Sequence, residues 1–217
     1  MLNLDDVLLD LFNRVEIVDF RLIGLKGGEE PLDVAIVEGA VMSEEEERRL
    51  EEIRRRSRLL VALGDCACSG GKFIVKDFGI ERVDANLPRG VREFRADPLD
   101  KYVKVDYYVY GCPVERREIF SLFKDLLLGK EIKRVSYNVC AECILRENAC
   151  LLDRGMPCLG PITRGGCGAL CPSSGRECQG CRGLAEDANI DSLVEIMKEK
   201  GIEVPEFLWI IRGGVRR

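Results

Sequence analysis

The chain has 217 residues, of which 46% are hydrophobic and 33% are charged, a balance typical of a folded globular protein. A total of 33 Lys and Arg against 38 Asp and Glu gives a net charge of -5, so no overall positive field favours nucleic acid or a membrane surface. Histidine is absent, which excludes Ser-His and Cys-His catalysis and histidine-ligated zinc. No apolar run approaches the roughly 18 residues of a membrane span. The 11 cysteines must therefore carry the chemistry.

The N-terminal region predicts helix and strand in alternation. Apolar residues at helical spacing predict a helix over Leu4–Phe12, and the β-branched run Val15–Val18 predicts a strand after it. A second short strand is expected over Asp33–Val37. Ser43 is the expected N-cap of a charged helix over Glu44–Arg56.

The same alternation continues further along the chain. Leu59–Leu63 and Val105–Tyr110 are apolar runs too short for helices, as expected of strands in a covered parallel sheet, and Glu115–Leu128 is amphipathic. Strands alternating with helices over residues 1–135 predict a doubly wound α/β domain with a parallel sheet.

Two stretches lack this periodicity. Gly64–Lys101 reads as a long loop, and loops of this length are usually functional or contact a partner. Residues 136–186 are rich in Cys, Gly, Pro and Arg, so we expect this second domain to be held by metals rather than by a hydrophobic core. Residues 187–217 predict a C-terminal helix, Ile190–Lys198, and an apolar tail.

Eight of the cysteines form two groups of four in the second domain. They are Cys140, Cys143, Cys150 and Cys158, followed by Cys167, Cys171, Cys178 and Cys181. A 4Fe-4S cluster takes four thiolates, and a C-x2-C step followed elsewhere by Cys-Pro is typical of ferredoxins, so two clusters account for all eight. Two four-cysteine zinc sites are the alternative, although only two of the pairs have knuckle spacing. Disulfides belong to small secreted chains, and no signal peptide opens this sequence.

Two further cysteines follow predicted strands. Cys66 lies just after the strand that ends at Leu63, and Cys112 lies just after the strand that ends at Tyr110. Open α/β sheets place their ligands at the carboxyl ends of such strands. We therefore interpret both as ligands, although a lone cysteine is more often a small buried hydrophobe.

These motifs together resemble the small subunits of cytosolic NiFe hydrogenases, of the F420-reducing, F420-non-reducing and sulfhydrogenase types. The resemblance spans about residues 4–185 and rests on five motifs: V-E-G-A at 37–40, G-D-C-A-C-S-G-G at 64–71, G-C-P at 111–113, C-L-G-P-I-T-R-G-G-C-G-A-L-C-P at 158–172 and C-x2-C-R-G at 178–183. It implies a flavodoxin-like domain that holds a proximal 4Fe-4S cluster against a large NiFe subunit, followed by an iron-sulfur domain.

The resemblance also implies a role for each cysteine. Cys66 and Cys112 match proximal ligands. The group of four that begins at Cys140 matches the distal cluster, and the group that begins at Cys167 matches the medial cluster. The family also uses a C-x2-C after a first strand, which this sequence lacks, so we expect a late start with ~20 to 40 residues missing. Cys68 as a third proximal ligand is the alternative. As written, the chain is expected to hold two clusters, and a third if the motif were restored.

The resemblance implies electron transfer within a cytoplasmic hydrogenase. Its expected partners are the NiFe large subunit and a flavin or iron-sulfur acceptor subunit, with no nucleic acid and no membrane span. The sequence leaves open whether the terminal acceptor is F420, NAD(P), polysulfide or a heterodisulfide reductase. Two other interpretations remain: the small iron-sulfur subunit of an NADH:quinone oxidoreductase-related complex, which lacks the eight-cysteine extension, and a zinc-stabilised scaffold.

Overall fold

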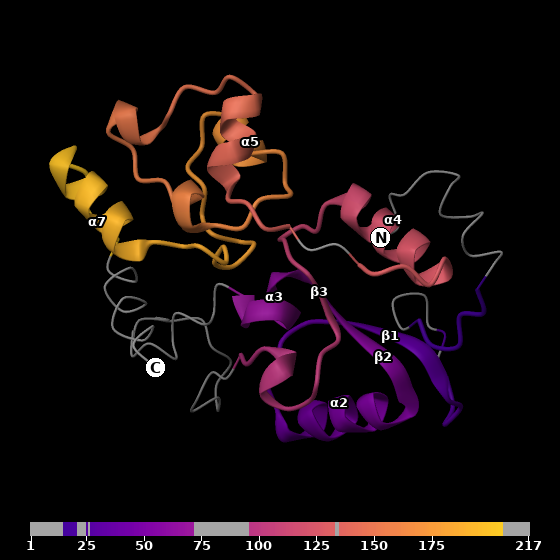
Figure 1. The fold of residues 1–217 in the computed structure, drawn as a ribbon. Coiled ribbons are helices and arrows are strands. Elements are labelled where there is room, and N and C mark those ends of the chain that lie inside the picture. Colours follow the sequence, from indigo (N-terminus) through magenta and orange to yellow (C-terminus); the bar gives the residue numbers. More distant parts are fainter. Residues whose placement is uncertain (1–14, 21–24, 26, 72–95, 133–134, 206–217) are drawn as a thin grey trace.

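A three-stranded parallel sheet organises the N-terminal part of the chain (Figure 1). The computed structural model describes residues 15–20, 25, 27–71, 96–132 and 135–205. The strands are β1 (Leu32–Glu38), β2 (Ser57–Leu63) and β3 (Tyr107–Val109), in that spatial order. The first two confirm the predicted strands.

Strand β3 is shorter than predicted. The Asp106 carboxylate accepts a hydrogen bond from the Leu60 N–H at 2.9 Å, so a side chain satisfies an amide of β2 that a longer β3 would bond through its backbone. The predicted strand at Val15–Val18 is wrong: these residues are not a strand, and the nearby pairing among the described residues is one isolated bridge between Phe20 and Leu25. The predicted helix at 4–12 and the apolar tail from 206 lie outside the described residues.

Helix α2 (Glu44–Arg56) has the predicted bounds and cap. The Ser43 hydroxyl accepts a hydrogen bond from the Glu46 N–H at 3.3 Å, and the Glu46 carboxylate accepts one from the Met42 N–H at 2.7 Å. The first turn carries four glutamates and the last three arginines, which complements the helix dipole at both ends.

Helices cover both faces of the sheet. Helix α2, the short helix α3 (Gly64–Ser69) and the 3-10 turn η3 (Leu99–Lys101) pack on one face, where Leu50, Leu60 and Leu99 are buried together. Helix α4 (Arg116–Leu127) packs on the other face through Ile119 and Leu122. This arrangement confirms an α/β fold with a parallel sheet. The described strands run in one order without a reversal, so a doubly wound sheet stays a prediction.

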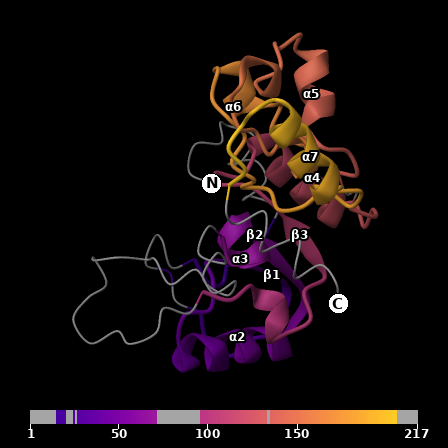
Figure 2. The ribbon, with the colours of Figure 1, turned by 90° about the vertical axis from the view of Figure 1, so that its left-hand side faces the viewer.

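The cysteine-rich segment forms a second body beyond the carboxyl end of the sheet (Figures 1 and 2). It consists of short turns of helix joined by loops. These turns are α5 (Val139–Leu145), η4 (Leu152–Arg154), η5 (Gly160–Ile162) and α6 (Leu170–Ser173).

Our prediction that this segment lacks a hydrophobic core is wrong. Helix α7 (Ile190–Glu199), which confirms the predicted amphipathic helix, packs against η5. Its buried face joins apolar side chains of the cysteine-rich turns in one core, among them Val139, Leu152, Ile162, Leu193 and Met197. Among the described residues, no helix is long and apolar enough to cross a membrane.

Candidate functional site

Cys66 and Cys112 lie at the carboxyl ends of the adjacent strands β2 and β3. Cys66 is in the first turn of α3, and the Asp65 N–H before it donates a hydrogen bond to the Gly111 carbonyl at 3.0 Å, which joins the two strand ends. Burial raises the pKa of the Cys66 thiol, and the charges of Asp65 and Cys112 raise it further. A Cβ at Gly71 would lie 3.0 Å from the Cys66 sulfur, so this glycine leaves room beside the thiol. We call this pair of thiols the sheet-edge group.

Cys68 is turned away from the sheet-edge group and into the core. Its Sγ lies 3.4 Å from the Ala62 carbonyl and 3.5 Å from the Val109 carbonyl, in the core between the sheet and helix α2. Burial raises its pKa to about 12, so it stays a protonated thiol at neutral pH. The structure therefore gives Cys68 a packing role rather than the ligand role considered above.

The first four cysteines of the second domain gather around α5. Cys140 and Cys143 lie three residues apart on this helix, and a Cβ at Gly160 would meet the sulfurs of Cys140 at 3.4 Å and Cys158 at 3.5 Å. Burial raises the pKa of Cys140 to about 12, and charges that raise it further come from Cys158, Cys143 and Cys150. We call these four thiols the α5 group.

The last four cysteines lie between the other two groups. We call Cys167, Cys171, Cys178 and Cys181 the middle group. Burial raises the pKa of Cys181, a backbone hydrogen bond from Cys112 lowers it, and the charge of Cys171 raises it. Burial raises the pKa of Cys178 to about 11, and the charges of Cys158 and Cys181 add to this rise. The Cys178 carbonyl accepts a hydrogen bond from the Leu159 N–H at 3.0 Å, and Arg182 donates one to the Tyr110 carbonyl at 2.8 Å, so the middle group borders both other groups.

All 11 cysteines are free, so no disulfide framework holds the fold. Within the described ranges, no three metal-binding side chains stand together as the ligands of one metal ion would. A cubane cluster spreads its thiolates over four irons, whereas one zinc ion draws four sulfurs to ~2.3 Å from itself. The donor set, thiols gathered in groups with glycines beside the sulfurs of Cys66, Cys140 and Cys158, fits iron-sulfur clusters.

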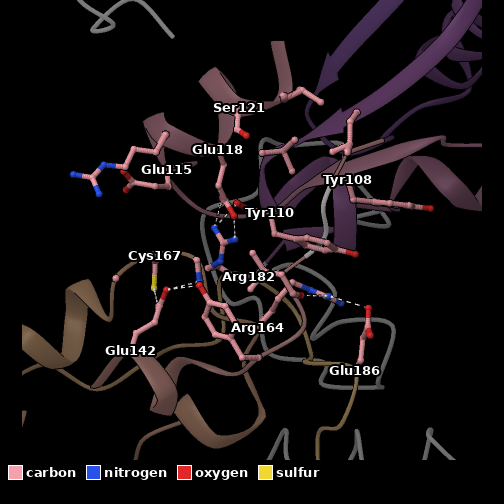
Figure 3. A pocket seen from close by; sticks show the side chains of 18 of the residues that line it. Tyr108, Tyr110, Glu115, Glu118, Ser121, Glu142, Arg164, Cys167, Arg182 and Glu186 are labelled. Carbon is pink, nitrogen blue, oxygen red and sulfur yellow. Dashed lines mark hydrogen bonds and ion pairs between the residues drawn. The ribbon is translucent and has the colours of Figure 1, made fainter. Parts of the chain in front are cut away.

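Sequence reasoning missed a buried ionic contact between the two bodies (Figure 3). Arg182, whose side chain is 2% exposed, donates two hydrogen bonds to the Glu118 carboxylate of α4 at 2.6 and 2.8 Å. Burial raises the pKa of Glu118, although the bonds from Arg182 oppose the rise. The pair borders a cavity of about 630 Å³ that is also lined by Tyr110, Arg164 and Cys167.

It also missed Glu142, which lies between Cys140 and Cys143. Its carboxylate accepts hydrogen bonds from the N–H groups of Gly166 at 2.7 Å and Ala169 at 3.1 Å, on both sides of Cys167. Figure 3 shows Glu142 pointing at this loop. The available signals were local: an acidic residue inside a C-x2-C step and an arginine directly after Cys181.

Grouped thiols beside a parallel sheet define a cysteine-rich electron-transfer protein. The family model described as "NADH ubiquinone oxidoreductase, 20 Kd subunit" matches residues 1–126, and the chain belongs to this family.

Two relatives extend the likeness across the cysteine-rich segment. "Sulfhydrogenase 2 subunit delta" of Pyrococcus furiosus is 40% identical over 203 residues, which cover 92% of this chain and 86% of the relative. A vhu subunit of the F420-non-reducing hydrogenase of Methanocaldococcus jannaschii is 32% identical over 246 residues, with 95% and 85% covered. The resemblance to hydrogenase small subunits is thereby confirmed.

A solved structure also has this fold. It is the actinobacterial-type NiFe-hydrogenase from Ralstonia eutropha, which aligns over 94% of this chain and 77% of its own with a TM-score of 0.52. Its sequence identity is 16%, so the likeness shows the fold alone.

Proposed function

We infer that the chain is the electron-transfer small subunit of a NiFe hydrogenase, and we propose that it relays electrons through 4Fe-4S clusters. The electrons pass between the NiFe site of a large subunit and a downstream acceptor subunit. The position of the middle group beside both other groups is the observation that carries this proposal. The Cys178 carbonyl accepts a hydrogen bond from the Leu159 N–H, next to Cys158, and Arg182, next to Cys181, donates one to the Tyr110 carbonyl before Cys112.

Each thiol group has a proposed role. The sheet-edge group supplies proximal ligands, the middle group the medial cluster and the α5 group the distal cluster. Such clusters take up and release one electron at a time, with potentials set by nearby hydrogen bonds and exposure. The chain contributes the thiolates and closely approaching backbone, as at Gly160 beside Cys140 and Cys158.

The chain divides into three parts in this proposal. Residues 1–135 are the flavodoxin-like, doubly wound domain, residues 136–186 the iron-sulfur domain and residues 187–217 the C-terminal helix and tail. Because α7 shares a core with the cysteine-rich turns, the third part stabilises the second.

The proposed partners meet opposite ends of the relay. The large subunit covers the sheet edge, where Glu38 is exposed at the end of β1, through an interface of at least ~2,000 Å². A flavin or iron-sulfur acceptor subunit meets the α5 group, and the complex is cytoplasmic. The nature of the terminal acceptor depends on these other subunits.

The NADH:quinone oxidoreductase interpretation has less support. The family model stops at residue 126, before the eight clustered cysteines, whereas the hydrogenase relatives match 92% and 95% of the chain. The zinc scaffold interpretation has less support from the sequence, since only two of the cysteine pairs have the C-x2-C step of zinc knuckles.

The test is replacement of a middle-group ligand in the anaerobically purified complex. Cys171→Ser should stop acceptor reduction by hydrogen, because electrons no longer leave the relay, while hydrogen isotope exchange at the large subunit continues. Cys68→Ala is the matched control, because its thiol faces the core and both activities should remain. Acceptor reduction at the native rate in Cys171→Ser would contradict the proposal.

A further inference from the structure

The guanidinium group of Arg182 lies where the two bodies of the molecule meet. Besides its two bonds to Glu118, it donates from Nε to the Gly165 carbonyl at 2.6 Å and from Nη1 to the Tyr110 carbonyl at 2.8 Å. One buried side chain thus forms hydrogen bonds to the residue after β3, to helix α4 and to the loop before Cys167. Figure 3 shows Arg182 between Glu118 and Tyr110.

Each backbone group that bonds to Arg182 lies two residues before a cysteine that we propose as a ligand. The Tyr110 carbonyl is two residues before Cys112 of the sheet-edge group, and the Gly165 carbonyl is two residues before Cys167 of the middle group. Arg182 itself directly follows Cys181. The guanidinium therefore joins the segments of three ligands that belong to two different groups.

The glycines directly before these ligands make room for the contact. A Cβ on Gly166 would lie 2.4 Å from Arg182 Nη2 and 2.6 Å from Glu118 Oε1. A Cβ on Gly111 would lie 3.3 Å from Arg182 Nη1 and 2.8 Å from the Pro113 carbonyl. Both glycines also have positive φ, +107° and +130°, which side chains rarely adopt. The backbone at Gly111 and at Gly166 thus leaves the space that the Arg182 guanidinium occupies.

We propose that Arg182, held in place by Glu118, is a positioning residue that fixes the spacing between the sheet-edge group and the middle group. It thereby sets the electron-transfer step between them. This inference rests on the proposed function. Arginine suits the role because its planar fork directs several donors at once, whereas lysine has one small ammonium head and cannot reach the same acceptors together.

The test is Arg182→Lys in the assembled hydrogenase complex, prepared with the C-x2-C motif restored so that the sheet-edge cluster is present. Pulsed EPR of the reduced complex measures the magnetic dipolar splitting between the sheet-edge and middle clusters, which falls with the cube of their separation. We expect the splitting to shift or broaden into a spread of distances. The rate of hydrogen-driven acceptor reduction should fall while isotope exchange at the large subunit is unchanged.

Arg54→Lys is the matched control. Arg54 Nη1 donates to Asp106 at 2.6 Å, so this variant also removes a partly buried arginine fork from a carboxylate. Neither residue neighbours a proposed ligand. A purely stabilising role of Arg182 predicts that both variants lose stability and that neither alters the splitting.

The outcomes separate the inference from the function on which it rests. A wild-type complex without iron-sulfur signals contradicts the proposed function itself. Full signals with an unaltered splitting in Arg182→Lys overturn only the inference, as does a wild-type complex with clusters but no splitting at this step. If Arg182→Lys does not assemble, Glu118→Gln is the test instead. It keeps the shape of the side chain that holds Arg182 but removes its charge, so the splitting should again shift or broaden. An unaltered splitting would overturn the inference.

Discussion

Leu193 of α7 tests whether the cysteine-rich segment is held by apolar packing as well as by its clusters. Its side chain is 1% exposed and belongs to the core that α7 shares with Val139, Leu152 and Ile162. Truncation to alanine removes buried methyl groups and leaves a cavity, which costs about 2 to 5 kcal/mol. Because ~1.4 kcal/mol corresponds to a tenfold change in an opening equilibrium, the core should open about 30 to 5,000 times more often.

Amide hydrogen exchange in the metal-loaded complex measures this opening. We expect exchange to accelerate by that factor at amides of the cysteine-rich turns in Leu193→Ala. Glu195→Ala is the control on the same helix, because Glu195 is exposed and its replacement should change stability by at most about 0.5 kcal/mol. Equal protection in both variants would show that the clusters alone hold the segment and would refute the role given to α7.

Two further predictions concern the cysteines and their glycines. Burial raises the pKa of Cys68 to about 12, so its thiol should stay protonated in the folded complex at pH 9. It should therefore resist iodoacetamide, whereas an ordinary thiol of pKa about 8.5 reacts. Early labelling of Cys68, detected by mass spectrometry, would contradict this prediction. Gly166→Ala should displace Arg182 and cost several times more stability in thermal unfolding than Gly175→Ala, because Gly175 shares a positive φ but has nothing within 4 Å; equal losses would argue against the close contact.

Local patterns in the sequence predicted the regular elements well. The capped and charged helix Glu44–Arg56 and the apolar strand ending at Leu63 are set by side chains close in sequence, and both lie as expected. The strand at Val15–Val18 did not form, because β-branched residues need a pairing neighbour that composition does not supply. The length of β3 depended on one side chain. The Asp106 carboxylate accepts the hydrogen bond of the Leu60 N–H in β2, which a longer β3 would have bonded through its backbone.

The core of the cysteine-rich segment was missed for a related reason. Val139, Leu152 and Ile162 sit in separate short turns, so they have no common period along the chain, and their partners come from α7. Hydrophobic periodicity detects one face of one element and says nothing about contacts between distant irregular turns.

The candidate site divides in the same way. Spacing singled out the eight clustered cysteines, because thiolate clusters take four ligands in short steps, and the positions of Cys66 and Cys112 after predicted strands singled out the other two. Arg182 and Glu118 are 64 residues apart in sequence, and neither stands out until the two bodies are seen together. Cys68 follows Cys66 after one residue and was the alternative third ligand in the sequence, whereas the structure turns its side chain into the core.

The central claim is that this chain carries iron-sulfur clusters on its clustered thiols. Native mass spectrometry of the chain, released from the anaerobically purified complex, counts its bound metal and sulfide directly. The two groups of four cysteines predict about eight iron atoms and eight sulfides, with two clusters reducible by hydrogen before release. Bound zinc without sulfide, at about one ion per four cysteines, would contradict the account.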